Sequence, residues 1–289
     1  MAPSRRNTPA HFRRAFLFIA VAFCTIAFAA APPARAPDLA QTGKPDAAEA
    51  ARLLEQFRGA GVPGEYFLDF ALHALPRRGE EQVYQGRLWG GRNEEGAISR
   101  VELTDGAGRI HRLLIQNGER AAVWRWQDGK AIRFGVAELF QPLIPGVEVT
   151  AFDVQMPFLY WPAATLERIS RIRGRPAHAF LFKAPADFSA QTTEVAAARA
   201  YLDTQFNALM QTELISNNGR VLKTFSLVSL KTLDRQPLPK SADYRNEITR
   251  DKTRLVVNGA ALNVKVPAGT FDAAALGRDL PLPAGVVRF

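Results

Sequence analysis

The longest continuous pattern in the chain is a series of strand-like runs between residues 208 and 261. They include TELISNNGRVLKTFSLVSL and KSADYRNEITRDKTRLVV, and they show almost no helical periodicity. The runs are broken by Asn217-Asn218-Gly219 and by the stretch from Asp234 to Pro239, both of which favour turns. The pattern predicts a broad antiparallel meander. A sheet with such long strands must close, stack on a second sheet, or have its concave apolar face covered.

A second group of strands is predicted nearer the amino terminus. Tyr66, Leu68 and Phe70 fall on one face of a strand, and Asp69 falls on the opposite face. Further strands are predicted at 83–89, 98–104, 110–116, 121–126, 131–134, 166–173 and 177–183. The breaks between the first five of these are short: Gly90-Gly91, Asp105-Gly106, Asn117-Gly118 and Asp128-Gly129. Short connections make consecutive strands antiparallel neighbours, because parallel strands need long crossovers.

One helix is predicted, and a middle section is predicted to form short helices or a folded-over segment. Residues 45–58 carry Ala and Leu at helical spacing, with acids early and glycines after the end, which predicts a short amphipathic helix. Residues 136–140 and 152–161 are dense in large apolar side chains, and Pro157 and Pro162 disfavour ladder strands there. Because this middle section separates the two groups of strands, it is the candidate cover for the concave face.

The first 36 residues are predicted to be a secretory signal peptide. Arginine pairs at 5–6 and 13–14 precede an apolar run from Ala15 to Ala31 that contains no carboxylate, and Ala34-Arg35-Ala36 offers small residues for cleavage. Cleavage after Ala31 and an uncleaved anchor are alternatives. Cys24, the single cysteine, lies in this run, where its lipidation is a further alternative; the mature chain would contain no thiol. Residues 37–289 are predicted to form one domain, since no linker composition interrupts them.

The alkaline charge balance is partly a property of the leader. The chain has 37 basic and 28 acidic residues, and five of the arginines, with no acid, lie in residues 1–36. The remainder carries a net charge near +4, which permits association with an anionic membrane surface. It does not indicate a nucleic-acid partner, which usually requires a clustered basic stripe.

The sequence lacks the motifs of the common enzyme classes. It has no GxSxG, no phosphate-binding loop and no HExxH, so we expect neither catalysis nor a cofactor or metal. The three histidines beyond the leader each stand alone in a predicted strand, and Glu80-Glu81 and Glu94-Glu95 are interpreted as solvated loop charges. A glycosidase with carboxylates converging from distant strands, such as Asp69, Glu102 and Asp153, stays an alternative. The arginines at 168, 171, 173 and 175 favour a charged edge strand over a docking patch for acidic lipids or partners.

Large apolar side chains are more abundant than a minimal core requires. They come from the first strands, the middle section and the late meander, and they are the candidate lining of a cavity and its lid. The candidate ligand-binding residues are Tyr66, Leu68, Phe70, Leu88, Phe152, Met156, Phe158, Leu159, Trp161, Phe225 and Leu227. Core filling is the competing explanation for each one.

Several of these segments, in this order, resemble a known family. The order is PFLYWP at 157–162, an RGRP strand start, YLDTQFNALMQTEL, NNGRVLKTF, a lysine-containing sixth strand SLKTLD, and RDKTRLVV. It resembles the outer-membrane lipoprotein-sorting proteins, the LolA-like group, over residues 48–261. The resemblance implies a mainly β, curved antiparallel half-barrel with a short α-helical lid, of the LolA/LolB-like kind.

The resemblance also implies a function. Such a protein would be secreted to the periplasm, bind acyl chains of lipoproteins or other lipids in a hydrophobic cavity, and meet inner- and outer-membrane sorting complexes as partners. A dry groove suits this task, because exposing about 15 methylenes to water costs on the order of 12 kcal/mol. The alternative is a periplasmic sensor or structural protein that uses the same scaffold to bind a partner without lipid transfer.

Overall fold

A computed structural model describes residues 45–289 of the 289-residue chain. Its helical segments are short except for the first: α1 (Ala47–Gly59), α2 (Val136–Leu139), α3 (Ala151–Gln155), η1 (Pro157–Tyr160), α4 (Ala186–Ser189) and η2 (Ala273–Ala275). The strands are β1 (Tyr66–Leu75), β2 (Gln82–Asn93), β3 (Gly96–Thr104), β4 (Ile110–Gln116), β5 (Ala122–Gln127), β6 (Lys130–Arg133), β7 (Ala164–Ile172), β8 (Arg175–Lys183), β9 (Ala197–Asp203), β10 (Leu209–Ile215), β11 (Val221–Leu233), β12 (Gln236–Asn246), β13 (Lys252–Leu262) and β14 (Val287–Arg288).

Within residues 45–289, all the strands belong to one antiparallel sheet. Its order is β6-β5-β4-β3-β2-β1-β13-β12-β11-β10-β9-β8-β7, with β14 paired to β13. The pairing of β1 with β13 joins the two groups of strands that the sequence predicts, through a register that runs from Tyr66 opposite Leu262 to Leu75 opposite Lys252. The sheet therefore has two ends, β6 and β7, and it does not close on itself.

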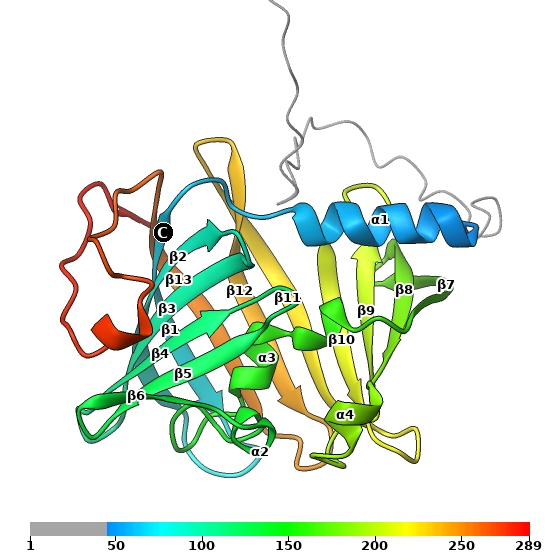
Figure 1. The fold of residues 1–289 in the computed structure, drawn as a ribbon, viewed down its shortest axis with the longest axis horizontal. Coiled ribbons are helices and arrows are strands. Elements are labelled where there is room, and N and C mark those ends of the chain that lie inside the picture. The colour runs from blue at the N-terminus through cyan, green and yellow to red at the C-terminus, as the bar shows by residue number, and fades with distance from the viewer. Residues whose placement is uncertain (1–44) are drawn as a thin grey trace, which may run out of the picture.

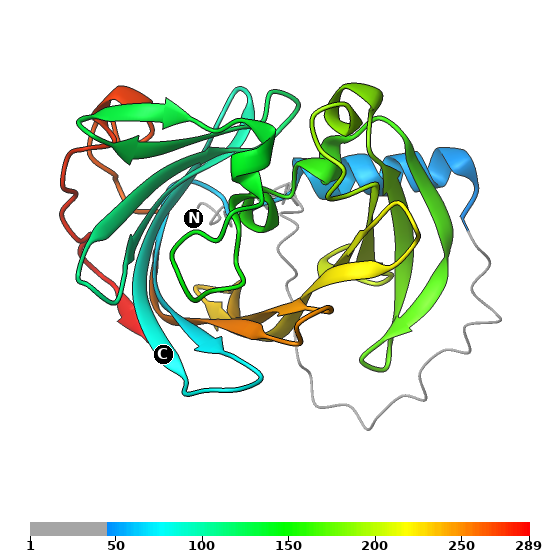
Figure 2. The ribbon, with the colours of Figure 1, turned by 90° about the horizontal axis from the view of Figure 1, so that it is seen from below.

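The sheet bends into an open trough with two arms (Figure 1; Figure 2). We call β1 to β6 the first arm and β7 to β10 the second arm; β11, β12 and β13 form the floor between them. Seen from below, the short segments α2, α3 and η1 lie in the mouth between the arms, and α1 runs along the second arm (Figure 2). A mainly β half-barrel with a helical cover, as the sequence predicts, is confirmed.

The first helix begins and ends where the sequence predicts. The Asp46 side chain accepts the backbone N–H of Glu49 at 2.8 Å and so caps the amino-terminal end of α1. Ala50 and Leu54, one turn apart, are the buried residues of the helix. They pack on the second arm, which leaves the opposite face of α1 exposed.

Three expectations about strand boundaries are wrong. Gly90 and Gly91 lie inside β2, and the chain turns at Glu94-Glu95 instead. A Cβ at Gly90 would stand 2.1 Å from the Tyr66 ring, so this glycine provides room for an aromatic side chain rather than a turn. The run SLKTLD is no separate strand, because Val221–Leu233 is one continuous strand.

The third wrong expectation is that the break between strands extends from Asp234 to Pro239. The turn is only Asp234-Arg235, and Pro237 and Pro239 lie within β12. Residues 236–239 pair with β11 but not with β13, whose pairing with β12 covers only 241–245. This stretch of β12 is therefore an unpaired edge on one side, where a proline without an N–H is tolerated.

The carboxyl-terminal residues 263–289, which we call the strap, cover the convex face of the first arm. Phe67 and Trp89 on that face pack against Val264, Phe271 and Leu280 of the strap. Figure 1 shows the strap as the red segment outside the strands of the first arm. The fully buried Arg100 lies under it, with its guanidinium bonded to Glu102 at 2.8 Å and to backbone carbonyls of the strap.

Candidate functional site

The concave face carries one apolar cluster in each arm. The first-arm cluster contains Phe70, Leu72, Val101, Leu103, Leu113, Ile115 and Val257. The second-arm cluster contains Leu54, Leu166, Phe180, Phe182, Leu202 and Leu214. Both clusters include residues of the segment 136–161, which we call the cover. Ile144, Val147 and Val149 of the cover fill the first arm, and Phe152, Phe158 and Trp161 fill the second.

Aromatic rings form the centre of the cover. The Phe152 ring stacks on Phe140 with 4.7 Å between centroids and lies 5.8 Å from Phe158 and 5.9 Å from Phe188. Trp161 approaches Phe188 at 5.0 Å. These rings bury large apolar areas without backbone pairing to the sheet, so apolar packing holds this part of the cover in place.

A small polar cluster fixes α3 to the floor of the trough. Oδ2 of the buried Asp153 accepts the backbone N–H of Thr150 at 2.9 Å and its hydroxyl at 2.8 Å. The Asp153 backbone N–H in turn donates to Thr150 Oγ1 at 3.2 Å, and the two bonds that involve backbone N–H groups form a capping box. The Lys223 ammonium on β11 donates to the same oxygen at 2.7 Å and to the Glu148 carbonyl at 2.7 Å. Lys223 thus ties α3 and Glu148, two residues before the cap Thr150, to the sheet.

A second tie joins the cover to the first arm. The Gln155 amide donates to the Gln116 carbonyl at 2.9 Å, and the Asn117 amide donates to the Gln155 carbonyl at 2.9 Å. Met156 follows with φ of 49°, a left-handed conformation that non-glycine residues seldom adopt. The backbone reverses there and directs Pro157–Tyr160 toward the second arm.

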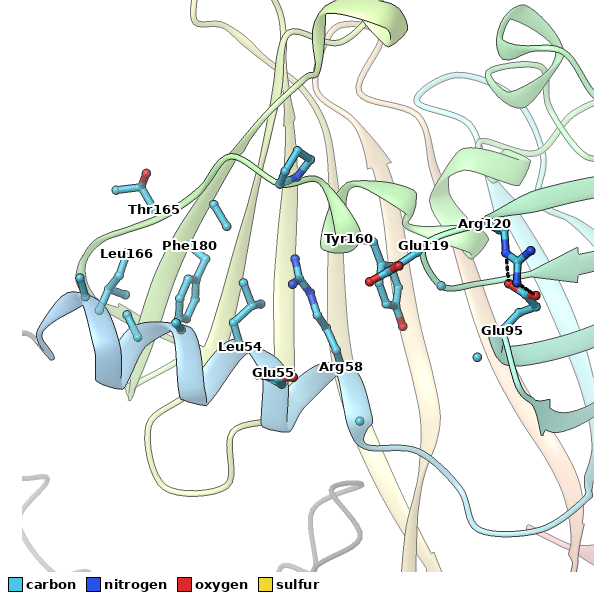
Figure 3. A pocket seen from close by; sticks show the side chains of 18 of the residues that line it. Leu54, Glu55, Arg58, Glu95, Glu119, Arg120, Tyr160, Thr165, Leu166 and Phe180 are labelled. Carbon is cyan, nitrogen blue, oxygen red and sulfur yellow. Dashed lines mark hydrogen bonds and ion pairs between the residues drawn. The ribbon is translucent and has the colours of Figure 1, made fainter.

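A large cavity lies between α1, the cover and the rim of the first arm. Its volume is about 1170 Å³. Figure 3 shows Leu54, Leu166 and Phe180 at one end, Arg58 in the middle, and Tyr160, Glu119 and the Glu95–Arg120 pair toward the other end. We call this cavity the α1 groove. A smaller cavity of about 380 Å³ lies where the cover meets β10 to β12, and Lys223 is among its lining residues.

Arg58 connects α1 to the cover across this groove. Its Nε donates to the Leu159 carbonyl at 2.6 Å, and its guanidinium lies 5.6 Å from the centre of the Tyr160 ring. Burial lowers the pKa of Arg58 and raises that of Tyr160. At the adjoining end of β1, burial raises the pKa of Tyr66 to about 12.

The structure brings most of the predicted ligand-binding residues to the concave face, in two groups. Phe152, Phe158, Leu159 and Trp161 are buried in the second-arm cluster, with Met156 packed against it. Phe70 is buried in the first-arm cluster, with Leu68, Leu88 and Phe225 half-buried against it. Tyr66 and Leu227 belong to neither cluster. None of these residues lines the α1 groove.

The residues of the α1 groove are the ones that sequence reasoning misses. Arg58 falls in the last turn of a predicted helix, and the sequence pattern of Glu94-Glu95 is that of a solvated turn. The helix itself is predictable, but its partners across the groove lie more than 30 residues away along the chain. No local pattern reports that kind of proximity.

The carboxylates of the hydrolase alternative belong to three separate clusters. Asp69 contacts Arg288, Glu102 contacts Arg100 and Arg112, and Asp153 contacts Lys223. Among residues 45–289, no group of three or more His, Cys, Asp or Glu side chains is arranged to hold a metal ion. Two of the three strand histidines have carboxylate neighbours: His73 lies 2.5 Å from Glu81, and His111 lies 2.8 Å from Asp105.

No helix in residues 45–289 has the length and apolar character needed to span a membrane. The predicted leader, Cys24 and the anchor alternative lie outside the described residues.

Comparison with known proteins gives a match of fold but not of sequence. No protein-family model matches the chain, and no curated protein does. A solved domain classed with the outer membrane lipoprotein-sorting proteins of Vibrio parahaemolyticus aligns over 80% of this chain and 97% of its own, with a TM-score of 0.67 and 14% identity. A DUF1329 family protein from Desulfovibrio piger aligns over 79% of this chain and 98% of its own, with a TM-score of 0.66 and 9% identity.

A third solved structure has a similar fold. A LolA superfamily protein from Nitrosomonas europaea aligns over 77% of this chain and 96% of its own, with a TM-score of 0.59 and 17% identity. The three alignments span nearly the whole length of the known structures. The chain therefore has the LolA-like fold.

Proposed function

We propose that the protein binds acyl chains of lipoproteins or of other lipids under its cover and carries them through the periplasm toward the outer membrane. The observation that supports this most is the way the cover is held. Between β6 and β7 the chain contributes large apolar side chains to both arms, yet its one isolated β-bridge, Pro142 to Thr150, lies within the cover itself.

A cover held in this way can be replaced by a ligand of the same character. An acyl chain that takes the place of Phe152 and Phe158 meets the same apolar walls, so the trough exchanges one apolar contact for another. Removing about 15 methylenes from water is worth on the order of 12 kcal/mol. This free energy offsets the cost of moving a few aromatic rings and of breaking the hydrogen bonds of Lys223 and Gln155 to the cover and the sheet.

Carriage of this kind needs no nucleophile, metal or cofactor, in agreement with the motifs that the sequence lacks. The predicted leader at residues 1–36 supplies the export step, and membrane sorting complexes would be the donor and acceptor of the cargo. The Vibrio parahaemolyticus domain is classed with proteins that sort lipoproteins, which makes lipoprotein acyl chains the first cargo to test.

Mass spectrometry of organic extracts tests this proposal directly. The full chain is expressed with its own leader in a Gram-negative host, purified from the periplasm without detergent, and extracted. Acyl species at close to one mole per mole of protein are expected. Clean protein, together with no binding of a pyrene-labelled monoacylglycerol, would contradict the proposal and favour partner binding on the same scaffold.

A pair of variants tests where the acyl chain lies in the trough. Leu209→Gln places an amide on the concave wall of the second arm, where Leu209 is half-buried against the second-arm cluster, and we expect it to reduce the recovered acyl species several-fold. Val83→Gln is the matched control, because it makes the same kind of change at a strand position that is 49% exposed. Equal losses in both variants would place the ligand elsewhere.

A further inference from the structure

The α1 groove is divided into an apolar end and a charged end. Ala50, Leu54, Leu166 and Phe180 line the first, and they are continuous with the second-arm cluster that holds the cover. Arg58, Arg92, Glu55, Glu94 and Glu119 line the second. An elongated ligand with an apolar tail and a polar head fits this division, and only the polar end can select the head.

Two arginines provide the positive charge. Among residues 45–289, the contacts of Arg58 and Arg92 are with backbone carbonyls and the Tyr160 ring; Arg92 donates to the Ala60 carbonyl at 2.9 Å. Neither guanidinium forms an ion pair there, and each has five N–H donors. Both therefore keep donors that can meet an anionic oxygen at the groove, and a phosphate suits them best.

Acidic side chains also line the groove and give it negative charge. Glu95 is satisfied by Arg120, with Nε to Oε2 at 2.6 Å. Glu55, Glu94 and Glu119 form no ion pair within the described part of the chain. Figure 3 shows Glu119, like Tyr160, on the side of the groove away from Phe180. A purely anionic head would meet these carboxylates as like charges, whereas a cationic amine would pair with them.

We propose that the α1 groove binds a zwitterionic phospholipid head group, one with a phosphodiester and a primary amine. Arg58 and Arg92 bind the phosphate, Glu119 binds the ammonium, and the acyl chain lies along Leu54 and Phe180 toward the cover. This inference rests on the proposed function, because it assigns a head group to the lipid that the trough holds. A lipid without a charged head would leave both arginines and Glu119 unused.

The test compares three ligands that share one acyl chain. Lysophosphatidylethanolamine, lysophosphatidylglycerol and monoacylglycerol are titrated against a pyrene-labelled monoacylglycerol bound to the periplasmically purified protein. The probe has no charged head, so its binding reports the trough alone. We expect lysophosphatidylethanolamine to displace the probe at about ten-fold lower concentration than monoacylglycerol, with lysophosphatidylglycerol between them, since a hydrogen bond to a charged group contributes about this much.

Charge variants assign the roles. Arg92→Gln is expected to weaken both phospholipids about ten-fold and to leave monoacylglycerol unchanged. Glu119→Gln is expected to weaken lysophosphatidylethanolamine and to strengthen lysophosphatidylglycerol. Arg58→Gln also removes a phosphate ligand, but it removes the contact of α1 with the cover as well. The assignment of the phosphate therefore depends on the result for Arg92→Gln. Arg171→Gln and Glu80→Gln are matched controls at exposed positions outside the groove.

The outcomes separate the two proposals. Equal displacement by all three lipids, with the probe still binding, overturns the head-group assignment and leaves acyl binding intact. Stronger binding of lysophosphatidylglycerol than of lysophosphatidylethanolamine also overturns it, in favour of an anionic lipid. Failure of the probe to bind overturns both.

Discussion

The tie between Asp153 and Lys223 gives the sharpest test of how the cover is held. Asp153 is 5% exposed and Lys223 is 14% exposed at their side chains. Lys223→Met removes the ammonium while it keeps most of the apolar stem. It leaves a buried carboxylate that still accepts the Thr150 backbone N–H and hydroxyl.

The expected loss of stability follows from this arrangement. Stranding one member of a buried ion pair costs about 3 to 5 kcal/mol. The two remaining Thr150 donors place Lys223→Met near the lower end, at about 3 kcal/mol. For a domain of this size that corresponds to a fall in Tm of roughly 6 to 12 °C. Asp153→Asn costs less, about 2 kcal/mol, because Lys223 keeps the Glu148 carbonyl and lines a cavity into which its stem can turn.

A double-mutant cycle in urea measures the pair itself. The double variant should cost clearly less than the sum of the two single changes, with a coupling of about 2 kcal/mol. The same single variants should speed binding of the pyrene-labelled monoacylglycerol, because the cover then opens at lower cost. A coupling below about 0.5 kcal/mol would refute the reasoning, since it would mean that the pair does not hold α3 to the floor.

Three further predictions concern the sheet and its outer layer. Gly90→Ala puts a Cβ 2.1 Å from the Tyr66 ring and should lower the free energy of unfolding in urea by about 1 to 3 kcal/mol. Gly59→Ala, with nothing within 4 Å of its Cβ, should be close to neutral. Equal losses of stability in the two variants would contradict this prediction. The hydrogen bonds from His111 and from the Arg109 backbone N–H hold the pKa of Asp105 well below its usual range. The stability that the ionised Asp105 contributes is therefore present above about pH 4 and is lost as the pH falls toward the pKa of Asp105 in the folded protein. The difference in unfolding free energy between wild type and Asp105→Asn should narrow on acidification, and a difference that stays constant would argue against this reasoning. Arg100→Leu should raise amide exchange in residues 273–279 of the strap, where Arg100 contacts the Ala275 and Arg278 carbonyls, and unchanged exchange would show that apolar contacts alone hold the strap.

The sequence predicts the strands of this fold well because their side chains alternate between two different environments. In β1, Phe70 and Leu72 face the concave cluster while Phe67 faces the strap, and the alternation is visible in the sequence. The prediction fails where the reason for a residue lies on another strand. Gly90 is a residue type that favours a turn, but in the structure it leaves room for the Tyr66 ring of β1.

The same limit applies to β9 and to the groove. Ala197–Asp203 is central in the second arm and buried on both faces, so Ala198, Ala200 and Leu202 alternate with Tyr201 and give no clear period. The aromatic residues of the cover are identifiable because they are large and close together in sequence. The α1 groove is not, because Arg58, Arg92 and Glu119 become neighbours only when the sheet curves.

The two faces of the first arm are closed by different physical means, and this difference bears on which one opens. On the convex face, the strap adds β14 to the edge of β13, and Arg100 and Arg112 bind strap carbonyls from beneath it. Lifting the strap would expose the Arg100 guanidinium, which is now fully buried, and would remove Asp279 and the Gly277 carbonyl from Arg112. On the concave face, the cover is held by aromatic packing and by polar ties that include those of Lys223, Gln155 and Arg58. An acyl chain can replace the packing of the cover, but it cannot replace the hydrogen bonds under the strap. The proposed lipid therefore has a favourable exchange on one side only, and we expect the cover rather than the strap to move when it binds.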